Sequence, residues 1–138
     1  MLSQTAEYAL RAALQLAQQR EGEPLQAAEL ASRLRLPANY LSKTLHGLAR
    51  AGVLASARGK GGGFRLARPA GRIRLAEVIE PFDQLDGPQR CLLGRPECSD
   101  RTPCTAHWRW QGARQEAVRF YRATSLADLL REEPSDRR

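Results

Sequence analysis

The sequence predicts a mainly α-helical fold with one small β-hairpin and a long helix near the C-terminus. Apolar residues recur at helical spacing in three segments of the first fifty residues. A basic, glycine-rich run then separates two short segments that are typical of strands, and a further helical pattern follows a region that is rich in glycine, proline and cysteine. The 138 residues suffice for one ordinary domain, and 42% hydrophobic residues suffice for a buried core.

The first fifty residues predict three successive helices. Residues 2–19 form an amphipathic pattern, which Gly22, Glu23 and Pro24 interrupt. A short helix follows over residues 26–34. Pro37 then suits the entry of a third helix over residues 38–50, because proline has the backbone angle of a first helical position and needs no hydrogen-bond partner there.

A β-hairpin follows the third helix. Gly52 is suited to ending that helix, and residues 53–55 can form a strand. Residues 58–63 form a tight basic loop, and residues 64–67 alternate as a returning strand.

The second half predicts less regular structure. A short helix is expected over residues 74–82, and residues 83–103 are expected to be a loop. A long helix covers residues 104–123, and Ser125 to Asp128 resembles a capping signature for a last helix that ends near Glu133, before a frayed tail. The long helix carries one apolar stripe of Trp110, Ala113, Ala117, Phe120 and Tyr121.

Positive charge is concentrated in the first half of the chain. The formal net charge is +7, yet no acidic residue lies between Glu29 and Glu77, a stretch that holds ten lysines and arginines. Such a distribution predicts one basic face, and polyanions are the usual partners of a basic face.

This order of elements is the layout of a winged helix-turn-helix, and it predicts binding of double-stranded DNA. The third helix would enter the major groove, and the glycines of the hairpin tip would let the backbone approach the phosphates. Each feature alone is common on solvated surfaces, so the prediction rests on their combination. The glycine run is no phosphate-binding P-loop, because the typical Gly-Lys-Ser/Thr ending and the following helix are missing. The candidate DNA-contacting residues are Asn39, Tyr40, Ser42, Lys43, His46, Arg58, Lys60, Gly61 and Gly62.

Four candidate metal ligands lie within seventeen residues: Cys91, Cys98, Cys104 and His107. Zinc sites typically use cysteines two to four residues apart, whereas these have six and five residues between them. The wider loop favours an iron–sulfur cluster over zinc, and free thiols in a polar loop remain the plain alternative. Acidic residues near the loop are expected to be surface charges. No catalytic Ser/His/Asp or Cys/His set is apparent, so the protein is not expected to be an enzyme.

The sequence also predicts a cytoplasmic location. The N-terminal residues lack the pattern of a signal peptide, and no apolar run is long enough to span a membrane. An odd number of cysteines within fourteen residues argues against a disulfide framework and favours a reducing compartment.

These motifs together resemble the Rrf-type family of winged helix-turn-helix transcription regulators, including its iron–sulfur members of the IscR and NsrR kind. The resemblance covers nearly the whole chain. It rests on the three cysteines and on the segments Thr5–Arg11, Leu36–Lys43, Arg58–Leu66 and Ser125–Leu129.

The resemblance implies a homodimer that reads a palindromic operator, with the apolar stripe of the long helix as the candidate seam. It divides the chain into a DNA-binding domain (1–82), a cluster-binding loop (83–103), and a dimerisation helix with a C-terminal helix (104–138). It also implies two possible fourth ligands: His107 with a [2Fe–2S] centre, or Glu7 of the partner with a [4Fe–4S] centre. We favour His107 and [2Fe–2S], because a neutral imidazole adds no charge to a site that already holds three thiolates. The loop between Cys91 and Cys98 is one residue longer than is common in the family.

The functional expectation is a transcriptional regulator, acting as a repressor, whose operator affinity is switched by a cluster that senses redox state, nitric oxide or iron–sulfur status. The alternative is a winged-helix regulator with a structural zinc or no metal, controlled by a protein or metabolite partner. An electron carrier would leave the basic half unexplained.

Overall fold

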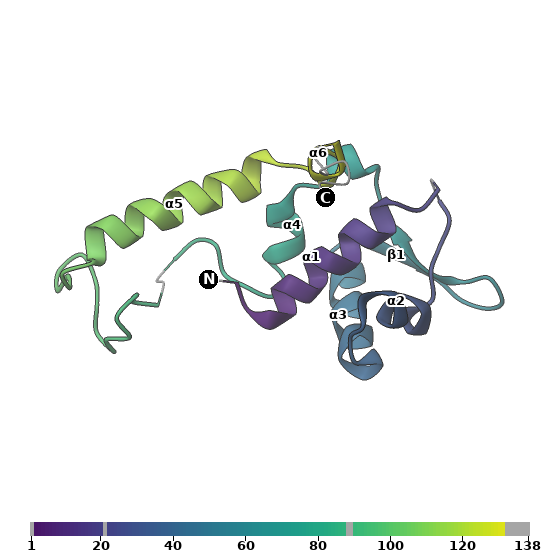
Figure 1. Cartoon of the computed structure of the whole chain (residues 1–138), viewed down its shortest axis with the longest axis horizontal. Coiled ribbons are helices and arrows are strands. Elements are labelled where there is room, and N and C mark those ends of the chain that lie inside the picture. The colour runs from purple at the N-terminus through teal and green to yellow at the C-terminus, as the bar shows by residue number, and fades with distance from the viewer. Residues whose placement is uncertain (1, 21, 88–89, 132–138) are drawn as a thin grey trace, which may run out of the picture.

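The computed structural model describes residues 2–20, 22–87 and 90–131 and shows a winged helix-turn-helix from which a long helix extends (Figure 1). The fold class is as predicted: mostly helical with one two-stranded antiparallel sheet. In chain order the elements are α1 (Gln4–Ala17), α2 (Ala27–Leu34), α3 (Ala38–Arg50), β1 (Leu54–Ala57), β2 (Gly63–Leu66), the 3-10 turn η1 (Ala70–Arg72), α4 (Leu75–Ile79), α5 (His107–Ala123) and α6 (Leu126–Arg131).

Helix α1 runs through the centre of the winged domain. It begins at Gln4, where the hydroxyl of Ser3 accepts a hydrogen bond from the N–H of Ala6, and it ends at Ala17. The helix is therefore two residues shorter at each end than predicted. Its buried face consists largely of alanines, which let α3 and α4 pack closely against it. The contacts formed by this small-residue face hold α1, α3 and α4 together as one core.

Helices α2 and α3 form the helix-turn-helix. The turn between them depends on Arg35, which takes the left-handed conformation with φ 57°. Helix α3 has the predicted bounds, and Leu41, Leu45 and Leu48 are fully buried on one side. The opposite side of α3 is exposed to solvent.

The hairpin of β1 and β2 forms the wing, with Leu54 paired to Leu66 and Ala57 to Gly63. A β-bridge between Leu25 and Phe64 ties β2 to the chain before α2. Gly63 has φ +135°, and a Cβ there would lie 2.3 Å from the carbonyl oxygen of Leu25. A side chain at this position is thus excluded by both backbone angle and space.

The second half departs from the predicted bounds at two places. Helix α4 ends at Ile79 rather than 82, since Pro81 has no N–H to continue it. Helix α5 begins at His107 rather than 104, because the N–H of His107 bonds to the carbonyl oxygen of Cys104 in a turn. The predicted extension of the last helix toward Glu133, and the tail beyond it, lie outside the described residues.

The predicted capping signature of α6 is present. Ser125 Oγ accepts from the N–H of Asp128 (3.0 Å), and Asp128 Oδ2 accepts from the N–H of Ser125 (2.9 Å). This cap holds Leu126, which is fully buried, against the core of the winged domain.

Helix α5 is an arm with no buried residue along its seventeen positions. Figure 1 shows it leading away from the winged domain, with the cysteine loop at its far end and the β-hairpin at the opposite side of the molecule. Among the residues that the structure describes, no helix has the length and apolar character needed to cross a membrane.

Candidate metal centre and nucleic-acid interface

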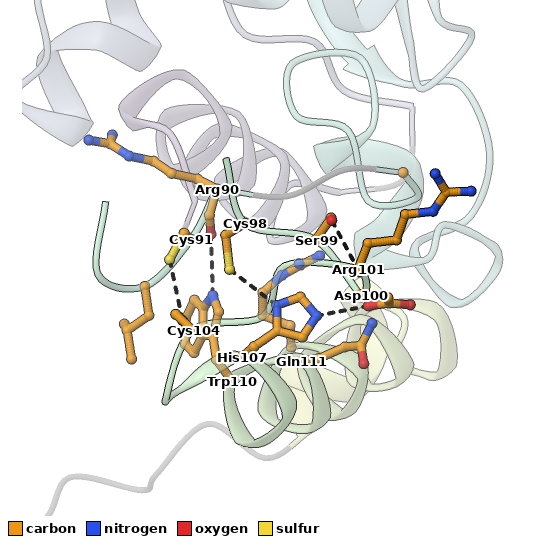
Figure 2. A pocket seen from close by; sticks show the side chains of 13 residues that line it. Arg90, Cys91, Cys98, Ser99, Asp100, Arg101, Cys104, His107, Trp110 and Gln111 are labelled. Carbon is orange, nitrogen blue, oxygen red and sulfur yellow. Dashed lines mark hydrogen bonds and ion pairs between the residues drawn. The ribbon is translucent and has the colours of Figure 1, made fainter. Parts of the chain in front are cut away.

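The structure brings Cys91, Cys98 and Cys104 together at the start of α5. Their Sγ atoms all lie within 4.8 Å of one another, and those of Cys91 and Cys104 are 3.6 Å apart (Figure 2). All three thiols are free and partly exposed. Three thiols at this separation form a preassembled set of soft ligands.

His107 joins this group through Cys98. Its Nδ1 lies 3.2 Å from Cys98 Sγ, and its Nε2 lies 2.8 Å from Oδ1 of Asp100. The side chain of His107 is only 12% exposed. The expectation that acidic residues near the loop are surface charges is therefore incomplete for Asp100, which contacts a candidate ligand.

Backbone N–H groups surround the sulfur of Cys91. The N–H of Arg95 has the largest effect on the thiol and, opposed by burial but aided by the N–H of Leu93 and the thiols of Cys104 and Cys98, it lowers the pKa of Cys91 to about 7. The turn that aims these groups depends on Gly94, whose φ is +74° and whose N–H bonds to the carbonyl oxygen of Cys91. Cys91 is thus prepared to act as a thiolate, the form that binds metal.

The surroundings of Cys98 act in the other direction. The N–H of Cys104 lowers the pKa of the Cys98 thiol, but burial and the neighbouring thiols of Cys104 and Cys91 outweigh it, and the pKa is raised. Adjacent thiolates repel each other, so a cation in their midst would relieve this cost. The donor set therefore fits a metal or cluster.

The N-terminal end of helix α5 adjoins the cysteine site. His107 is its first residue, so the positive end of the helix dipole lies beside the thiols. The first turn of the helix contains no acidic side chain that would offset this positive charge. The indole Nε1 of Trp110 donates to the carbonyl oxygen of Arg90 at 3.3 Å and fixes the start of the loop on the helix. The cysteines line an open pocket of about 430 Å³ whose wall also includes Arg90, Arg101 and Arg114.

Glu7, the alternative fourth ligand, lies exposed in the first turn of α1. Among the described residues, the group of converging ligand atoms in one chain does not include it. Its assignment as a ligand from a partner subunit stays a prediction.

The candidate DNA-contacting residues lie on the open side of α3 and at the tip of the wing. Asn39, Tyr40, Lys43 and His46 are exposed, and Ser42 is half-buried. At the wing tip Arg58, Lys60 and Gly61 are exposed, whereas Gly62 is buried. A Cβ on Gly62 would lie 2.3 Å from the carbonyl oxygen of Ala57, so this glycine has a structural role in the turn as well.

Two of these residues, Tyr40 and His46, also contact neighbouring elements and so hold α3 in place. The hydroxyl of Tyr40 is hydrogen-bonded to Oγ1 of Thr5, and its ring packs edge-on against Tyr8 at 5.4 Å. The ring of His46 packs edge-on against Phe64 in β2, with centroids 5.3 Å apart. These contacts tie α3 to α1 on one side and to the wing on the other, a role that helical spacing alone did not reveal.

The chain is similar to known transcriptional regulators. Residues 2–132 match the Rrf2 family model, described as an iron-dependent transcriptional regulator. The HTH-type transcriptional regulator IscR of Xenorhabdus nematophila is 32% identical over 130 residues, covering 94% of this chain and 79% of that protein.

Two solved structures share the fold. The IscR of T. potens superposes with a TM-score of 0.75 at 22% identity, covering 99% of this chain and 93% of that one. CymR, the global cysteine regulator of B. subtilis, superposes with a TM-score of 0.76 at 23% identity, covering 97% and 98%. At these identities the structures support the winged-helix fold.

Proposed function

The chain belongs to the Rrf2 family of transcriptional regulators, and on that premise we propose that it is a cytoplasmic DNA-binding repressor whose operator affinity changes with the state of an iron–sulfur cluster. The observation that carries the proposal is the convergence of three cysteine Sγ atoms within 4.8 Å, at the start of the helix that extends from a winged domain. Residues 1–82 would read DNA, residues 83–103 would hold the cluster, and residues 104–138 would supply the dimer contacts.

Cys91, Cys98, Cys104 and His107 are the proposed ligands, and a [2Fe–2S] centre is the proposed cluster. The support for His107 is its position: Nδ1 already contacts the sulfur of Cys98, and the ring is largely buried. A [4Fe–4S] centre completed by Glu7 of the partner subunit is the alternative. When bound, an iron–sulfur cluster supplies redox chemistry and a reactive centre that small oxidants can reach.

The residues around the site link the order of the loop to α5. Cys104 leads directly into α5, and His107 is the first residue of the helix. Trp110 holds the carbonyl of Arg90, and Arg122 at the other end of α5 is paired with Asp86. The chain that leads into the loop thus contacts α5 near both ends, through Arg90 and Asp86, and a change in the order of the loop would act on these contacts.

Such a change can regulate DNA binding only if it favours one arrangement of the two winged domains over another. In a homodimer that pairs through α5, a shift of this helix would change the relative arrangement of the two winged domains. No residue of α5 is buried within one chain, and Trp108 and Phe120 are 56% and 49% exposed. Pairing through α5 would cover these apolar side chains and place two reading helices on the half-sites of a palindromic operator.

The experiment that tests the cluster is anaerobic purification followed by an absorption spectrum and analysis of iron, sulfide and zinc. Iron and sulfide in equal amounts would support the proposal, and iron per chain would separate two-iron from four-iron centres. One zinc per chain in a colourless protein would replace the sensor by a structural metal site. Metal-free protein would favour regulation by a protein or metabolite partner. Cys98→Ser should lose the iron, whereas Glu97→Gln, next to it in the loop and exposed, should retain it.

A further inference from the structure

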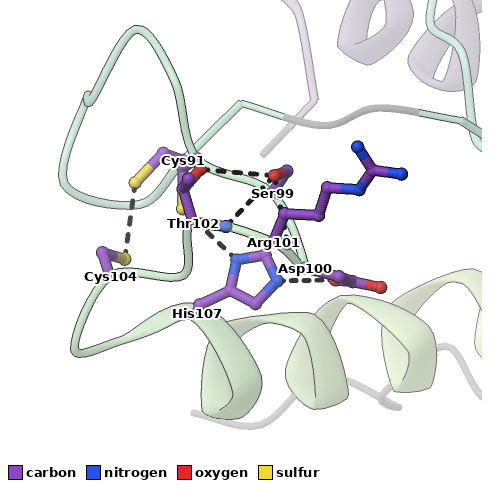
Figure 3. A network of polar contacts seen from close by, with 8 residues as sticks. Cys91, Ser99, Asp100, Arg101, Thr102, Cys104 and His107 are labelled. Atoms are coloured by element: carbon purple, nitrogen blue, oxygen red, sulfur yellow. Dashed lines mark hydrogen bonds and ion pairs between the residues drawn. The ribbon is translucent and has the colours of Figure 1, made fainter.

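Two residues of the segment 98–102 contact the two ring nitrogens of His107. Cys98 Sγ lies 3.2 Å from Nδ1 (Figure 2), and Asp100 Oδ1 lies 2.8 Å from Nε2 (Figure 3), so two residues separated by one position contact both ring nitrogens. Neither contact is a matter of sequence adjacency, since Asp100 is seven residues from His107.

The chemistry of the two partners fixes the role of each nitrogen. A carboxylate only accepts hydrogen bonds, so the pair with Asp100 requires a proton on Nε2. In a neutral ring the lone pair is then on Nδ1, the atom that lies beside Cys98 Sγ. The ring is therefore presented with its ligating nitrogen toward the thiols.

A local turn holds Asp100 in this place. Ser99 Oγ accepts from the N–H groups of Arg101 (3.2 Å) and Thr102 (3.3 Å), and the carbonyl oxygen of Ser99 accepts from the N–H of Thr102 (3.1 Å). These bonds set the backbone on both sides of Asp100. Although its carboxylate is 68% exposed, the backbone that carries it is thus constrained.

From this geometry we infer that Asp100 is a positioning residue for the cluster: it holds His107 so that Nδ1 is the ligand atom. The inference rests on the proposed function in so far as His107 is a ligand. Beyond the proposed function, the inference identifies which nitrogen of His107 is the ligand atom and which residue selects that nitrogen. The spacing of the cysteines and the histidine reveals neither. Metal-bound histidines usually donate their second N–H to such a partner, and loss of the partner typically lowers metal affinity about 10- to 100-fold.

The test compares Asp100→Ala and Asp100→Asn with the wild type and with a matched control, Glu97→Gln. Glu97 is an exposed carboxylate of the same loop, so its replacement removes the same charge without removing the contact to His107. The asparagine at position 100 retains an oxygen that accepts from Nε2–H.

The first readout uses cluster-free protein and needs no metal. Nitrogen-15 NMR of the imidazole should show His107 protonated on Nε2 in the wild type, in Glu97→Gln and largely in Asp100→Asn. Asp100→Ala should show a mixture of the two ring forms. A wild-type ring protonated on Nδ1, or an unchanged ring form in Asp100→Ala, would overturn the inference.

The second readout is the rate at which reconstituted protein loses iron to a chelator. Asp100→Ala should lose iron about tenfold faster than the wild type, with Glu97→Gln unchanged and Asp100→Asn in between. Adding Asp100→Ala to His107→Ala should cause no further loss, because Asp100 acts through His107. Equal rates for Asp100→Ala and wild type, or a further loss in the double variant, would contradict the inference. A wild type that takes up no iron would instead overturn the proposed function, while the NMR readout would still decide the placement of the ring.

Discussion

Nη2 of Arg122 lies 2.6 Å from Oδ2 of Asp86 and 3.8 Å from Oε1 of Glu80. Arg122 belongs to the last turn of α5, and both carboxylates belong to the segment between α4 and the cysteine loop. The ion pair therefore fixes the C-terminal end of α5, the end nearest the winged domain, to the chain that follows α4. Helix α5 thus has the candidate metal site at its N-terminal end and an ion pair with the chain after α4 at its C-terminal end, and so connects the cysteine loop to the winged domain.

Arg122→Ala should weaken this coupling without emptying the metal site. The iron content should equal that of wild type, while the ratio of operator affinities between loaded and cluster-free protein should shrink by up to about fivefold, because exposed ion pairs are weak. Quantitative DNA binding with both forms measures this ratio. The control is Arg119→Ala, because Arg119 is paired with Glu116 of the same helix and with no other acidic residue among those that the structure describes. Equal effects of the two substitutions would argue against the clamp.

Gly62→Ala and Arg58→Ala should separate the structure of the wing from its contact with DNA. A methyl group on Gly62 meets the carbonyl oxygen of Ala57, so the variant should be less stable by about 1–3 kcal/mol and should also bind DNA more weakly. Arg58 is exposed, so its loss should leave the Tm unchanged but reduce DNA affinity and its dependence on salt. Thermal unfolding and binding titrations at several salt concentrations measure both properties. An unchanged affinity in Arg58→Ala would exclude the wing tip from the interface.

Cys91 should be alkylated before Cys98 in cluster-free protein. The N–H of Arg95 stabilises its thiolate and lowers the pKa to about 7, whereas the pKa of Cys98 is raised. Alkylation of Cys91 should therefore be slow below pH 7, where the thiol is protonated, and should approach its maximum above pH 7. Iodoacetamide labelling across a pH series, read by peptide mass spectrometry, follows each cysteine separately. Faster labelling of Cys98 than of Cys91 would contradict the geometry of the loop.

Phe120→Ala should weaken the proposed dimer. Phe120 is half exposed on a helix that has no buried residue, and an aromatic side chain central to an interface contributes about 2 kcal/mol or more, which is about thirtyfold in the dimer Kd. Sedimentation at several protein concentrations measures this constant. Arg119→Ala, at the neighbouring position, serves as the control. If Phe120→Ala leaves the Kd unchanged, the seam lies on another face of the helix.

Much of the fold follows from short-range patterns in the sequence. The bounds of α3 and the cap of α6 are as predicted, because leucine spacing and the Ser125–Asp128 pair act over a few residues. The start of α5 was placed three residues too early, since the turn of Cys104 and His107 has no distinct sequence signal. The apolar stripe of α5 divides in the structure: Trp110, Ala117 and Tyr121 line a hollow beside the start of α1, whereas Phe120 is exposed.

The candidate site was predictable in its ligands but not in their surroundings. Cysteine and histidine spacing identified four residues, three of which the structure brings within 4.8 Å. Asp100 and the N–H groups around Cys91 were missed, because loop contacts follow no period and depend on backbone turns such as the one at Gly94. Bracing of α3 by Tyr8 and Phe64 likewise depends on residues that are distant in sequence.

The most direct test of the account is the affinity of one protein preparation for one DNA fragment before and after cluster removal. The fragment is selected by the protein itself from a random-sequence library, and binding is measured anaerobically at fixed salt, with Cys98→Ser alongside. We predict that loaded and cluster-free wild type differ by at least about fivefold, the lower range of typical allosteric coupling, and that Cys98→Ser behaves as the cluster-free form. Equal affinity of the loaded and cluster-free protein would contradict it.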